Sequence, residues 1–235
     1  MKKHIPNTIT CLNLVSGCIA IYQAFQGDYE MALFWIVSGA VFDFFDGMAA
    51  RLLGVSSPIG KELDSLADVV TFGVAPSAML FHTLSGIGQC SANGACPMLT
   101  ILPYFAFAIA AFSALRLAKF NLDERQAMGF IGLPTPANAL FWGSFIVGWE
   151  KWNFTTEFAP TMFLLGIMVS CQLLVSEIPM FALKFKHWGW KDNEVRYLFL
   201  LSCVPFLAFF GISGIALIIA WYVILSVLTK NRQHE

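Results

Sequence analysis

The strongest constraint on this chain is the series of long apolar segments that follow one another along almost its whole length. A helix needs about 20 apolar residues to cross roughly 30 Å of hydrocarbon, and eight segments approach or reach that length. The fifth, seventh and eighth are the weakest, because the fifth is short and only a brief turn separates the last two. The segments cover approximately residues 8–26, 30–52, 61–82, 99–120, 136–150, 159–184, 195–210 and 212–229. This pattern predicts an all-α polytopic membrane protein with about eight transmembrane helices.

Composition leads to the same class of protein. Of the 235 residues, 57% are hydrophobic and only 12% are charged, and the mean hydropathy is +0.68. A chain of this size with so little polar surface does not form a water-soluble globule. The formal net charge of -1 gives no bulk electrostatic attraction to nucleic acid, so we expect no nucleic-acid partner.

The basic residues predict the orientation. If eight helices cross and both termini are cytoplasmic, thirteen of the fourteen Lys and Arg residues lie on the cytoplasmic side and only Lys151 lies outside, as the positive-inside rule requires. Merging the last two segments into one re-entrant hairpin would keep most of this bias, so the charges constrain the orientation more than the helix count. The thirteen residues are Lys2, Lys3, Arg51, Lys61, Arg116, Lys119, Arg125, Lys184, Lys186, Lys191, Arg196, Lys230 and Arg232.

The domain organisation is predicted to be simple. No soluble domain, internal repeat or low-complexity stretch interrupts the apolar segments. The first segment begins with two lysines but has no small-residue cleavage site, so we interpret it as a retained helix and not a signal peptide. We therefore expect one integral-membrane domain over residues 1–235, with a core at about 1–184 and an additional helical hairpin at about 195–229.

Four aspartates occur at helical spacings within this apolar background. Asp43 and Asp46 are three residues apart, and Asp64 and Asp68 are four apart, so each pair projects from one face of its helix. Ionisable side chains in membrane segments face the protein interior or a polar cavity and are paired. The four carboxylates are therefore candidate cation ligands.

The two pairs are predicted to lie at the same depth. Asp43 precedes Arg51 by eight residues and Asp68 follows Gly60 by eight, so each lies about 12 Å along its helix from the cytoplasmic end. The four carboxylates converge when these two helices pack antiparallel. Ionised carboxylates brought together repel one another and lose hydration, and this cost requires compensating cations.

The ligand type and the neighbouring residues indicate the chemistry. Ligation by oxygen alone favours Mg²⁺, Mn²⁺ or Ca²⁺ over Zn²⁺, and two ions bridged by shared carboxylates are typical of in-line phosphoryl displacement. Gly47, Ala50 and Gly60 have little or no side chain, so they leave a backbone-lined gap beside the carboxylates. A bulky anionic group fits such a gap.

Three other functions would also use clustered aspartates. A cation transporter or an intramembrane aspartate network for helix packing would use the same carboxylates, but a transport path needs polar residues across the bilayer. Segments 30–52 and 61–82 are apolar outside their cytoplasmic thirds. A polyprenyl transferase would carry two Asp-rich motifs on distant helices, whereas this chain has one contiguous motif.

The motif resembles the signature of a known family. Asp43-x-x-Asp46-Gly47-x-x-Ala50-Arg51, then eight residues, then Gly60-x-x-x-Asp64-x-x-x-Asp68 fills every fixed position of the CDP-alcohol phosphatidyltransferase signature. Four further stretches resemble the phosphatidylserine synthases within that family, and together they cover most of the first 140 residues. These stretches are residues 5–17, 63–76, 116–121 and 130–137.

The resemblance implies an activity and a set of roles. A phosphatidyl group would pass from CDP-diacylglycerol to an alcohol, and CMP would leave. Asp43, Asp46, Asp64 and Asp68 would bind two divalent cations, Mg²⁺ or Mn²⁺, and Asp68 would act as general base on the acceptor hydroxyl. The CDP group of the donor would be bound by Gly47, Ala50 and Arg51, with Gly60 allowing close approach.

Two further sets of residues are candidates for binding. Asn7 and Thr10 recur with Asn13 at helical spacing and would face the donor's base or ribose, although helix capping and helix–helix hydrogen bonding explain them equally well. Arg116, Lys119 and Asn121 would receive the carboxylate of serine, or Arg116 and Lys119 are ordinary anchors that snorkel. Glycerol 3-phosphate and inositol remain alternative acceptors.

The resemblance also implies a setting. Family members are commonly homodimers, and a prokaryotic member would lie in the cell membrane with its active site on the cytoplasmic side. Outside the motif, Glu177 is predicted to be buried in segment 159–184, where an acid has a functional or paired role. Cys90 and Cys96 share the one long loop predicted outside the cytoplasm, and their spacing is compatible with either a disulfide or free thiols.

Overall fold

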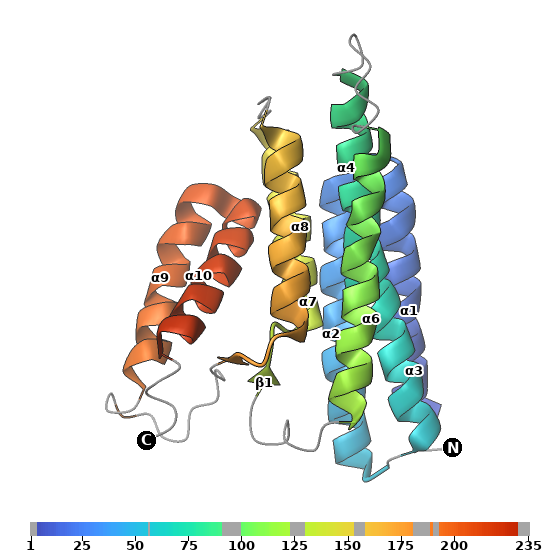
Figure 1. Cartoon of the computed structure of the whole chain (residues 1–235). Coiled ribbons are helices and arrows are strands. Elements are labelled where there is room, and N and C mark those ends of the chain that lie inside the picture. Colours follow the sequence, from blue (N-terminus) through green and yellow to red (C-terminus); the bar gives the residue numbers. More distant parts are fainter. Residues whose placement is uncertain are drawn as a thin grey trace.

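The chain folds into a bundle of roughly parallel and antiparallel helices (Figure 1). The structure, a computed structural model, describes residues 4–55, 57–90, 100–122, 130–152, 158–180, 189 and 193–229. The helices are α1(His4–Phe25), α2(Tyr29–Leu53), α3(Pro58–Asp68), η1(Val69–Val74), α4(Ala75–Cys90), η2(Leu102–Ala106), α6(Phe107–Leu122), α7(Thr135–Lys151), α8(Ala159–Val175), α9(Glu194–Phe210), η4(Gly211–Ser213) and α10(Gly214–Thr229). Two short strands, β1(Phe130–Ile131) and β2(Pro179–Met180), pair antiparallel.

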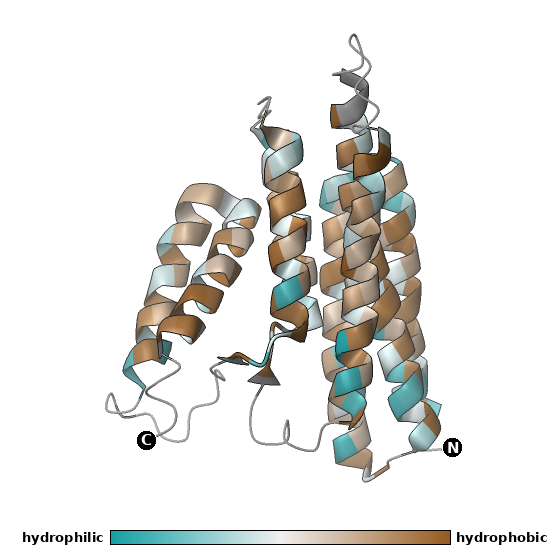
Figure 2. Ribbon diagram, in the orientation of Figure 1, coloured by the Kyte–Doolittle hydropathy of each residue, from teal (hydrophilic) through white to brown (hydrophobic). Residues whose placement is uncertain are grey.

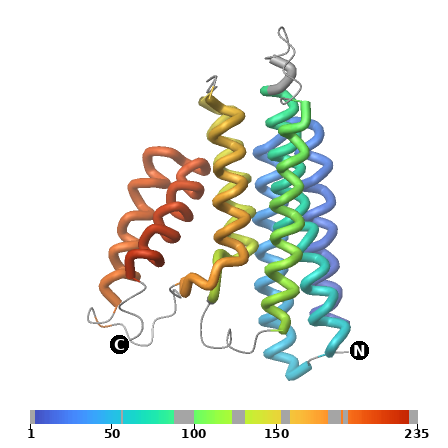
Figure 3. Tube along the Cα trace, viewed as in Figure 1, coloured from blue at the N-terminus to red at the C-terminus, as the bar shows by residue number. Residues whose placement is uncertain are grey.

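The first four membrane segments form the part of the bundle that contains the site. α3, η1 and α4 follow one another, η1 being a π-helix. α1 packs against α2, α3, η1 and α4, and α6 packs against η1. α7 and α8 lie beside this group, and the α9–α10 hairpin joins the bundle through α10, which packs against α7 (Figures 1 and 3).

The all-α polytopic membrane fold is confirmed. Each of the eight predicted segments contains a helix in the part of the chain that the structure describes. Five stretches there are long and apolar enough to cross a membrane: His4–Phe25, Tyr29–Leu53, Pro58–Ile87, Leu102–Leu122 and Glu194–Thr229. α7 and α8 have 17 residues each, or about 25 Å of helix. The count of eight crossings stays a prediction.

The helix in segment 159–184 ends earlier than predicted. α8 ends at Val175, and Pro179 and Met180 pair as a strand with β1. Pro179 has no N–H to donate to a helix and disfavours helical geometry in the preceding residue. Glu177 follows the end of α8 and is exposed, so it is not a buried intramembrane acid.

Charged residues gather at one end of the bundle. At the lower end of Figure 1, helices α1, α3 and α9 begin and helices α2 and α6 end. Figure 2 shows hydrophilic residues of α3 and α6 at the same end. Arg51, Lys61, Lys119 and Arg196 lie in the terminal turns that meet there, and Lys151 lies at the opposite end of α7. This arrangement agrees with the predicted charge bias. The other basic residues, except Arg116, and Cys96 lie outside the described residues, as does the side chain of Cys90.

A short capped turn joins the two helices of the motif. Gly54, with φ of 60°, ends α2 in the left-handed conformation that glycine adopts without strain. Ser57 caps α3: its side chain accepts a hydrogen bond from the backbone N–H of Gly60 at 3.0 Å, and Pro58 occupies the first turn. The turn reverses the chain directly, so the two halves of the motif run antiparallel.

Close packing fixes α1 against this pair. The Oγ1 atom of Thr71 in η1 donates a hydrogen bond to the backbone oxygen of Asn13 at 3.0 Å. A Cβ atom at Gly17 or at Gly39 would lie only 2.5 Å from the Thr71 side chain. The two glycines therefore allow α1, α2 and η1 to approach closely, as small residues do in membrane helix packing.

Candidate active site

Three of the four motif aspartates form a tight group. Asp43 on α2 and Asp64 and Asp68 on α3 each offer a carboxylate oxygen, and these atoms lie within 4.8 Å of one another. Asp68 is buried, and the other two are half-buried. The Oδ1 atom of Asp64 is buried and has no hydrogen-bond partner among the described residues. Ligation by oxygen and an unmet buried acceptor both suit a hard divalent cation.

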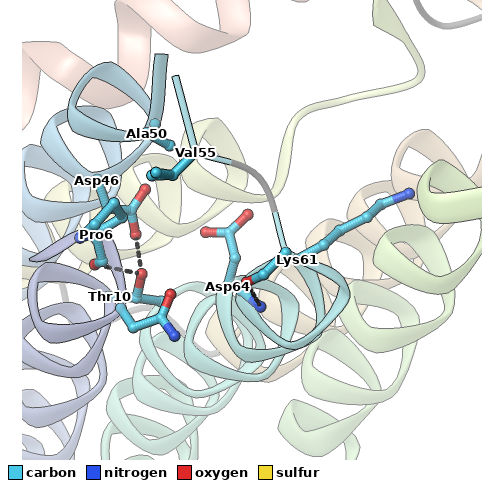
Figure 4. A pocket seen from close by; sticks show the side chains of 11 residues that line it. Pro6, Thr10, Asp46, Ala50, Val55, Lys61 and Asp64 are labelled. Atoms are coloured by element: carbon cyan, nitrogen blue, oxygen red, sulfur yellow. Dashed lines mark hydrogen bonds between the residues drawn. The ribbon is translucent and has the colours of Figure 1, made fainter. Parts of the chain in front are cut away.

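Asp46 lies beside this group and has a partner of its own. Its Oδ2 atom accepts a hydrogen bond from the Thr10 hydroxyl at 2.5 Å, and the residue is buried. Figure 4 shows the Asp46 and Asp64 carboxylates across a cavity from each other. The predicted convergence is therefore seen for three carboxylates, with the fourth at the adjoining cavity.

Helix α1 contacts both halves of the motif. Thr10 hydrogen-bonds to Asp46 on α2, and Asn13 Nδ2 donates to Asp68 Oδ1 on α3 at 3.1 Å. Asn13 is fully buried. The sequence placed Thr10 and Asn13 on one helical face but did not predict their aspartate partners. The signal was present, because two polar residues three apart on an apolar helix must find buried partners.

A cavity of about 240 Å³ opens next to the carboxylates (Figure 4). It is slightly smaller than the roughly 300–1,000 Å³ of sites that enclose a whole drug-sized ligand. Five of the six predicted donor-binding residues line it. The lining residues are Pro6, Asn7, Thr10, Asp46, Gly47, Ala50, Val55, Ser57, Gly60, Lys61 and Asp64.

Gly60 lines this cavity, whereas Arg51 lies close to it but outside its lining. A Cβ atom at Gly60 would lie 3.0 Å from Ser57 Oγ and 3.2 Å from Asn7 Oδ1, so any larger residue there would displace a wall. Arg51, the sixth predicted donor residue, is exposed, and its Nε donates to the backbone oxygen of Gly47 at 3.0 Å. The guanidinium is thus held close to the motif but does not line the cavity.

The three predicted acceptor residues differ in burial and in their hydrogen-bond partners. Arg116 is buried, and its Nη1 donates to Thr135 Oγ1 at 3.5 Å. Lys119 is exposed. Asn121 Nδ2 donates to Ser65 Oγ at 2.7 Å, which joins α6 to α3. Of the three, only Arg116 is buried.

Lys61 reinforces the same contact between α3 and α6. Its Nζ donates to the backbone oxygen of Asn121 at 3.0 Å. Figure 4 shows its side chain extending away from the cavity towards α6. The lysine therefore joins the start of α3 to α6, and its ammonium lies away from the cavity.

Comparisons with known proteins bear on this geometry. A family model described as CDP-alcohol phosphatidyltransferase matches residues 3–172, which include α1 to most of α8. A relative from Bacillus subtilis (strain 168), named CDP-diacylglycerol–serine O-phosphatidyltransferase, is 36% identical over 185 residues, which cover 79% of this chain and 91% of the relative. A relative of the same name from Helicobacter pylori (strain ATCC 700392 / 26695) is 31% identical over 198 residues, or 83% of this chain and 79% of the relative.

A more distant organism supplies a similar match. The protein of that name from Methanocaldococcus jannaschii is 35% identical over 136 residues, which cover 58% of this chain and 57% of the relative. The similarity to these relatives therefore extends well beyond the aspartate motif.

Proposed function

This chain belongs to the CDP-alcohol phosphatidyltransferase family, and from that premise we propose that it makes phosphatidylserine from CDP-diacylglycerol and L-serine. The observation that carries the proposal is the group of three carboxylates, within 4.8 Å of one another, beside a cavity lined by the small residues of the motif. In the reaction the serine oxygen attacks the phosphorus that bears the diacylglycerol. The bond from that phosphorus to the CMP oxygen breaks, and CMP leaves.

The carboxylates fit the cations that the family generally requires. We assign Asp43, Asp46, Asp64 and Asp68 as ligands for two ions, Mg²⁺ or Mn²⁺, because the donor set contains only oxygen and Asp64 Oδ1 has no other described partner. When bound, the cations supply positive charge that offsets the donor's pyrophosphate and the charge growing on the departing CMP.

The cavity is assigned to the CDP group of the donor. Gly47, Ala50 and Gly60 leave its walls close to the backbone, so a pyrophosphate can approach the helices. Asn7 and Thr10 supply polar side chains on the α1 side, where the base or ribose would lie. Arg51, held next to Gly47, would contribute positive charge outside the cavity wall.

Asp68 is assigned as the general base. It is buried, and the hydrogen bond from Asn13 engages one of its oxygens, which holds the orientation of the carboxylate. A serine hydroxyl is a weak nucleophile until a base takes its proton, and a positioned base contributes roughly 10²- to 10⁴-fold to the rate. The proton from serine moves to the Asp68 carboxylate as the new oxygen–phosphorus bond forms.

The cellular setting follows from the charges. The motif lies towards the end of the bundle that bears Arg51, Lys61 and Lys119, which supports a site on the cytoplasmic side of the cell membrane. There a water-soluble amino acid reaches a donor anchored in the bilayer. We place catalysis within residues 1–184 and treat the α9–α10 hairpin as an addition, with a homodimer as the assembly.

The test is a direct assay of acceptor choice. Purified protein with CDP-diacylglycerol and Mg²⁺ or Mn²⁺ is given serine, glycerol 3-phosphate or inositol, and CMP and the lipid product are measured. CMP and phosphatidylserine should form with serine alone. Turnover with glycerol 3-phosphate or inositol, but not with serine, would overturn the acceptor assignment.

A further inference from the structure

A polar contact between α1 and the helix that carries the second half of the motif lies next to Asp68. The side-chain Nδ2 of Asn13 donates to Asp68 Oδ1 at 3.1 Å, and the backbone oxygen of Asn13 accepts from Thr71 Oγ1 at 3.0 Å. Asn13 and Thr71 are both completely buried. Asn13 is therefore held at two points, one on its side chain and one on its backbone, by residues three positions apart.

Glycines on α1 and α2 complete this contact. A Cβ atom at Gly39 would lie 2.9 Å from Asn13 Oδ1 and 2.5 Å from Thr71 Cγ2, and a Cβ atom at Gly17 would lie 2.5 Å from Thr71 Oγ1. These distances are shorter than ordinary van der Waals contacts, so a larger residue at either position would displace Asn13 or Thr71. We call Asn13, Gly17, Gly39 and Thr71 the Asn13 junction.

One property of the Asn13 junction is not expected of a contact that serves packing alone. The Oδ1 atom of Asn13 is buried and has no hydrogen-bond partner among the described residues. A buried acceptor without a partner destabilises the folded state, and an apolar side chain of similar size would not have this effect. The same amide group supplies the N–H that binds Asp68. The unpaired oxygen therefore indicates that the hydrogen bond to Asp68 is what asparagine contributes at this position.

Thr71 differs from other buried hydroxyl residues of the same continuous helix. Ser77 Oγ donates to the backbone oxygen of Gly73 at 2.8 Å, and Thr83 likewise donates to a backbone oxygen one turn earlier in its own helix. The Thr71 hydroxyl instead crosses to α1. Thr71 also lies in η1, the π-helical turn that begins directly after Asp68, and such turns are frequent at functional sites.

We propose that Thr71 is a positioning residue that acts on Asp68 through Asn13, an assignment that rests on the proposed role of Asp68 as general base. The Thr71 hydroxyl holds the backbone of Asn13, and Gly39 confines the Asn13 amide from the α2 side. The amide N–H then reaches Asp68 from a fixed direction. The carboxylate is thereby held in one orientation when the proton of the acceptor hydroxyl moves to it.

The experiment removes the Thr71 hydroxyl while keeping the shape of the side chain. Thr71→Val should lower kcat by about 3- to 10-fold, the effect expected from one neutral hydrogen bond. The KM for CDP-diacylglycerol should change little, because neither Thr71 nor Asn13 lines the donor cavity. Thr71→Ser, which retains the hydroxyl, should keep most of the wild-type kcat. Initial-rate CMP release is measured with serine, CDP-diacylglycerol and Mg²⁺ or Mn²⁺.

A purely structural role of Thr71 gives a different result. If its hydroxyl only stabilises the packing of α1 against η1, Thr71→Val lowers the yield or thermal stability of the protein but leaves kcat per folded molecule at the wild-type value. Ser77→Ala is the matched control, because Ser77 is completely buried on the same continuous helix and its hydroxyl is paired locally. This variant should leave kcat and both KM values near wild type.

A double variant tests whether Thr71 acts through Asn13. Asn13→Ala removes the donor to Asp68 and should lower kcat by about 10- to 100-fold. Once that donor is absent, Thr71 has no side-chain amide to position, so adding Thr71→Val should lower kcat by less than about 2-fold further. Residues that act in one network are non-additive in this way, whereas independent residues are additive. A full multiplication of the two single effects would show that Thr71 acts independently of Asn13 and would refute the assignment.

The remaining outcomes separate this assignment from the proposed function. Should Thr71→Val not fold, Thr71→Ser and Thr71→Ala still decide, since both lack the methyl group and only serine retains the hydroxyl; equal kcat in the two variants refutes the role of Thr71. If the wild-type protein uses an alcohol other than serine, only the acceptor assignment fails, and the Thr71 variants are compared with that alcohol. If no alcohol supports CMP release by the wild-type protein, the proposed function fails and the role of Thr71 fails with it.

Discussion

The hydrogen bond from Asn13 to Asp68 gives the sharpest prediction about catalysis. It joins the fully buried Asn13 of α1 to the buried Asp68 of α3 at 3.1 Å. A hydrogen bond to a charged group contributes about 1.5–3 kcal/mol, and about 1.4 kcal/mol corresponds to a tenfold change in rate. If the bond orients Asp68 in the transition state, Asn13→Ala should lower kcat by about 10- to 100-fold.

The KM for CDP-diacylglycerol should change much less than kcat, because Asn13 does not line the donor cavity. Asn13→Asp should be more severe, since a carboxylate of similar size would replace the donor with a like charge next to Asp68. The assay is initial-rate CMP release over a matrix of serine and CDP-diacylglycerol concentrations, on protein that elutes as wild type in detergent.

Ser16→Ala provides the matched control. Ser16 lies one turn along α1 from Asn13, is also buried, and donates to the backbone oxygen of Leu12 at 2.8 Å. Its loss should leave kcat near wild type. Wild-type kcat in Asn13→Ala, or an equal fall in Ser16→Ala, would show that the Asn13 bond stabilises α1 without positioning Asp68.

Three further predictions concern the aspartates and the cavity. Asp68→Asn should lower kcat by at least about 100-fold while the protein still binds Mn²⁺, measured by electron paramagnetic resonance; full turnover would remove the general-base role. Removal of divalent cations with EDTA should abolish CMP release, and Mg²⁺ or Mn²⁺ should restore it; turnover that persists in excess EDTA would contradict the cation assignment. Gly60→Ala should raise the KM for CDP-diacylglycerol more than that for serine, because its Cβ would lie 3.0 Å from Ser57 Oγ and 3.2 Å from Asn7 Oδ1; an equal rise in both values would argue against donor binding at this cavity.

The aspartate motif could be predicted from sequence because its geometry is local. Spacings of three and four residues fix which side chains share a helix face, and a short turn sets Asp43 and Asp68 at matched depths. The structure adds the elements that make this turn, Gly54 at the end of α2 and the Ser57 cap of α3. Convergence of Asp43, Asp64 and Asp68 then needs no long-range information.

The partners of the aspartates could not be predicted in the same way. Thr10 and Asn13 are neutral residues in an apolar segment, and their pairing with Asp46 and Asp68 depends on which helix faces meet across the bundle. Arg116 was identified by its charge, but Lys119 has the same charge and is exposed. The burial of one and the exposure of the other follow from the packing of α6 against η1, which no spacing within α6 specifies.

The error at Glu177 has a related cause. Hydropathy alone extended segment 159–184 through Pro179, because Ile178, Met180 and their neighbours are apolar. At Pro179 and Met180 the chain instead forms β2, which pairs with β1, a strand that lies almost 50 residues earlier in the chain. Pro179 is a local signal against a helix, but the pairing of β2 with β1 depends on residues far away in the sequence.

In the proposed reaction the two substrates meet at Asp68, and each must reach it from a different environment. The donor is fixed in the bilayer by its acyl chains, so its CDP group has to enter between helices that are open at the charged end, and α1, α2 and α3 provide such a cavity. Serine arrives from water and loses its hydration when it enters a buried site. The site must therefore supply groups that replace the hydration of both charges of serine.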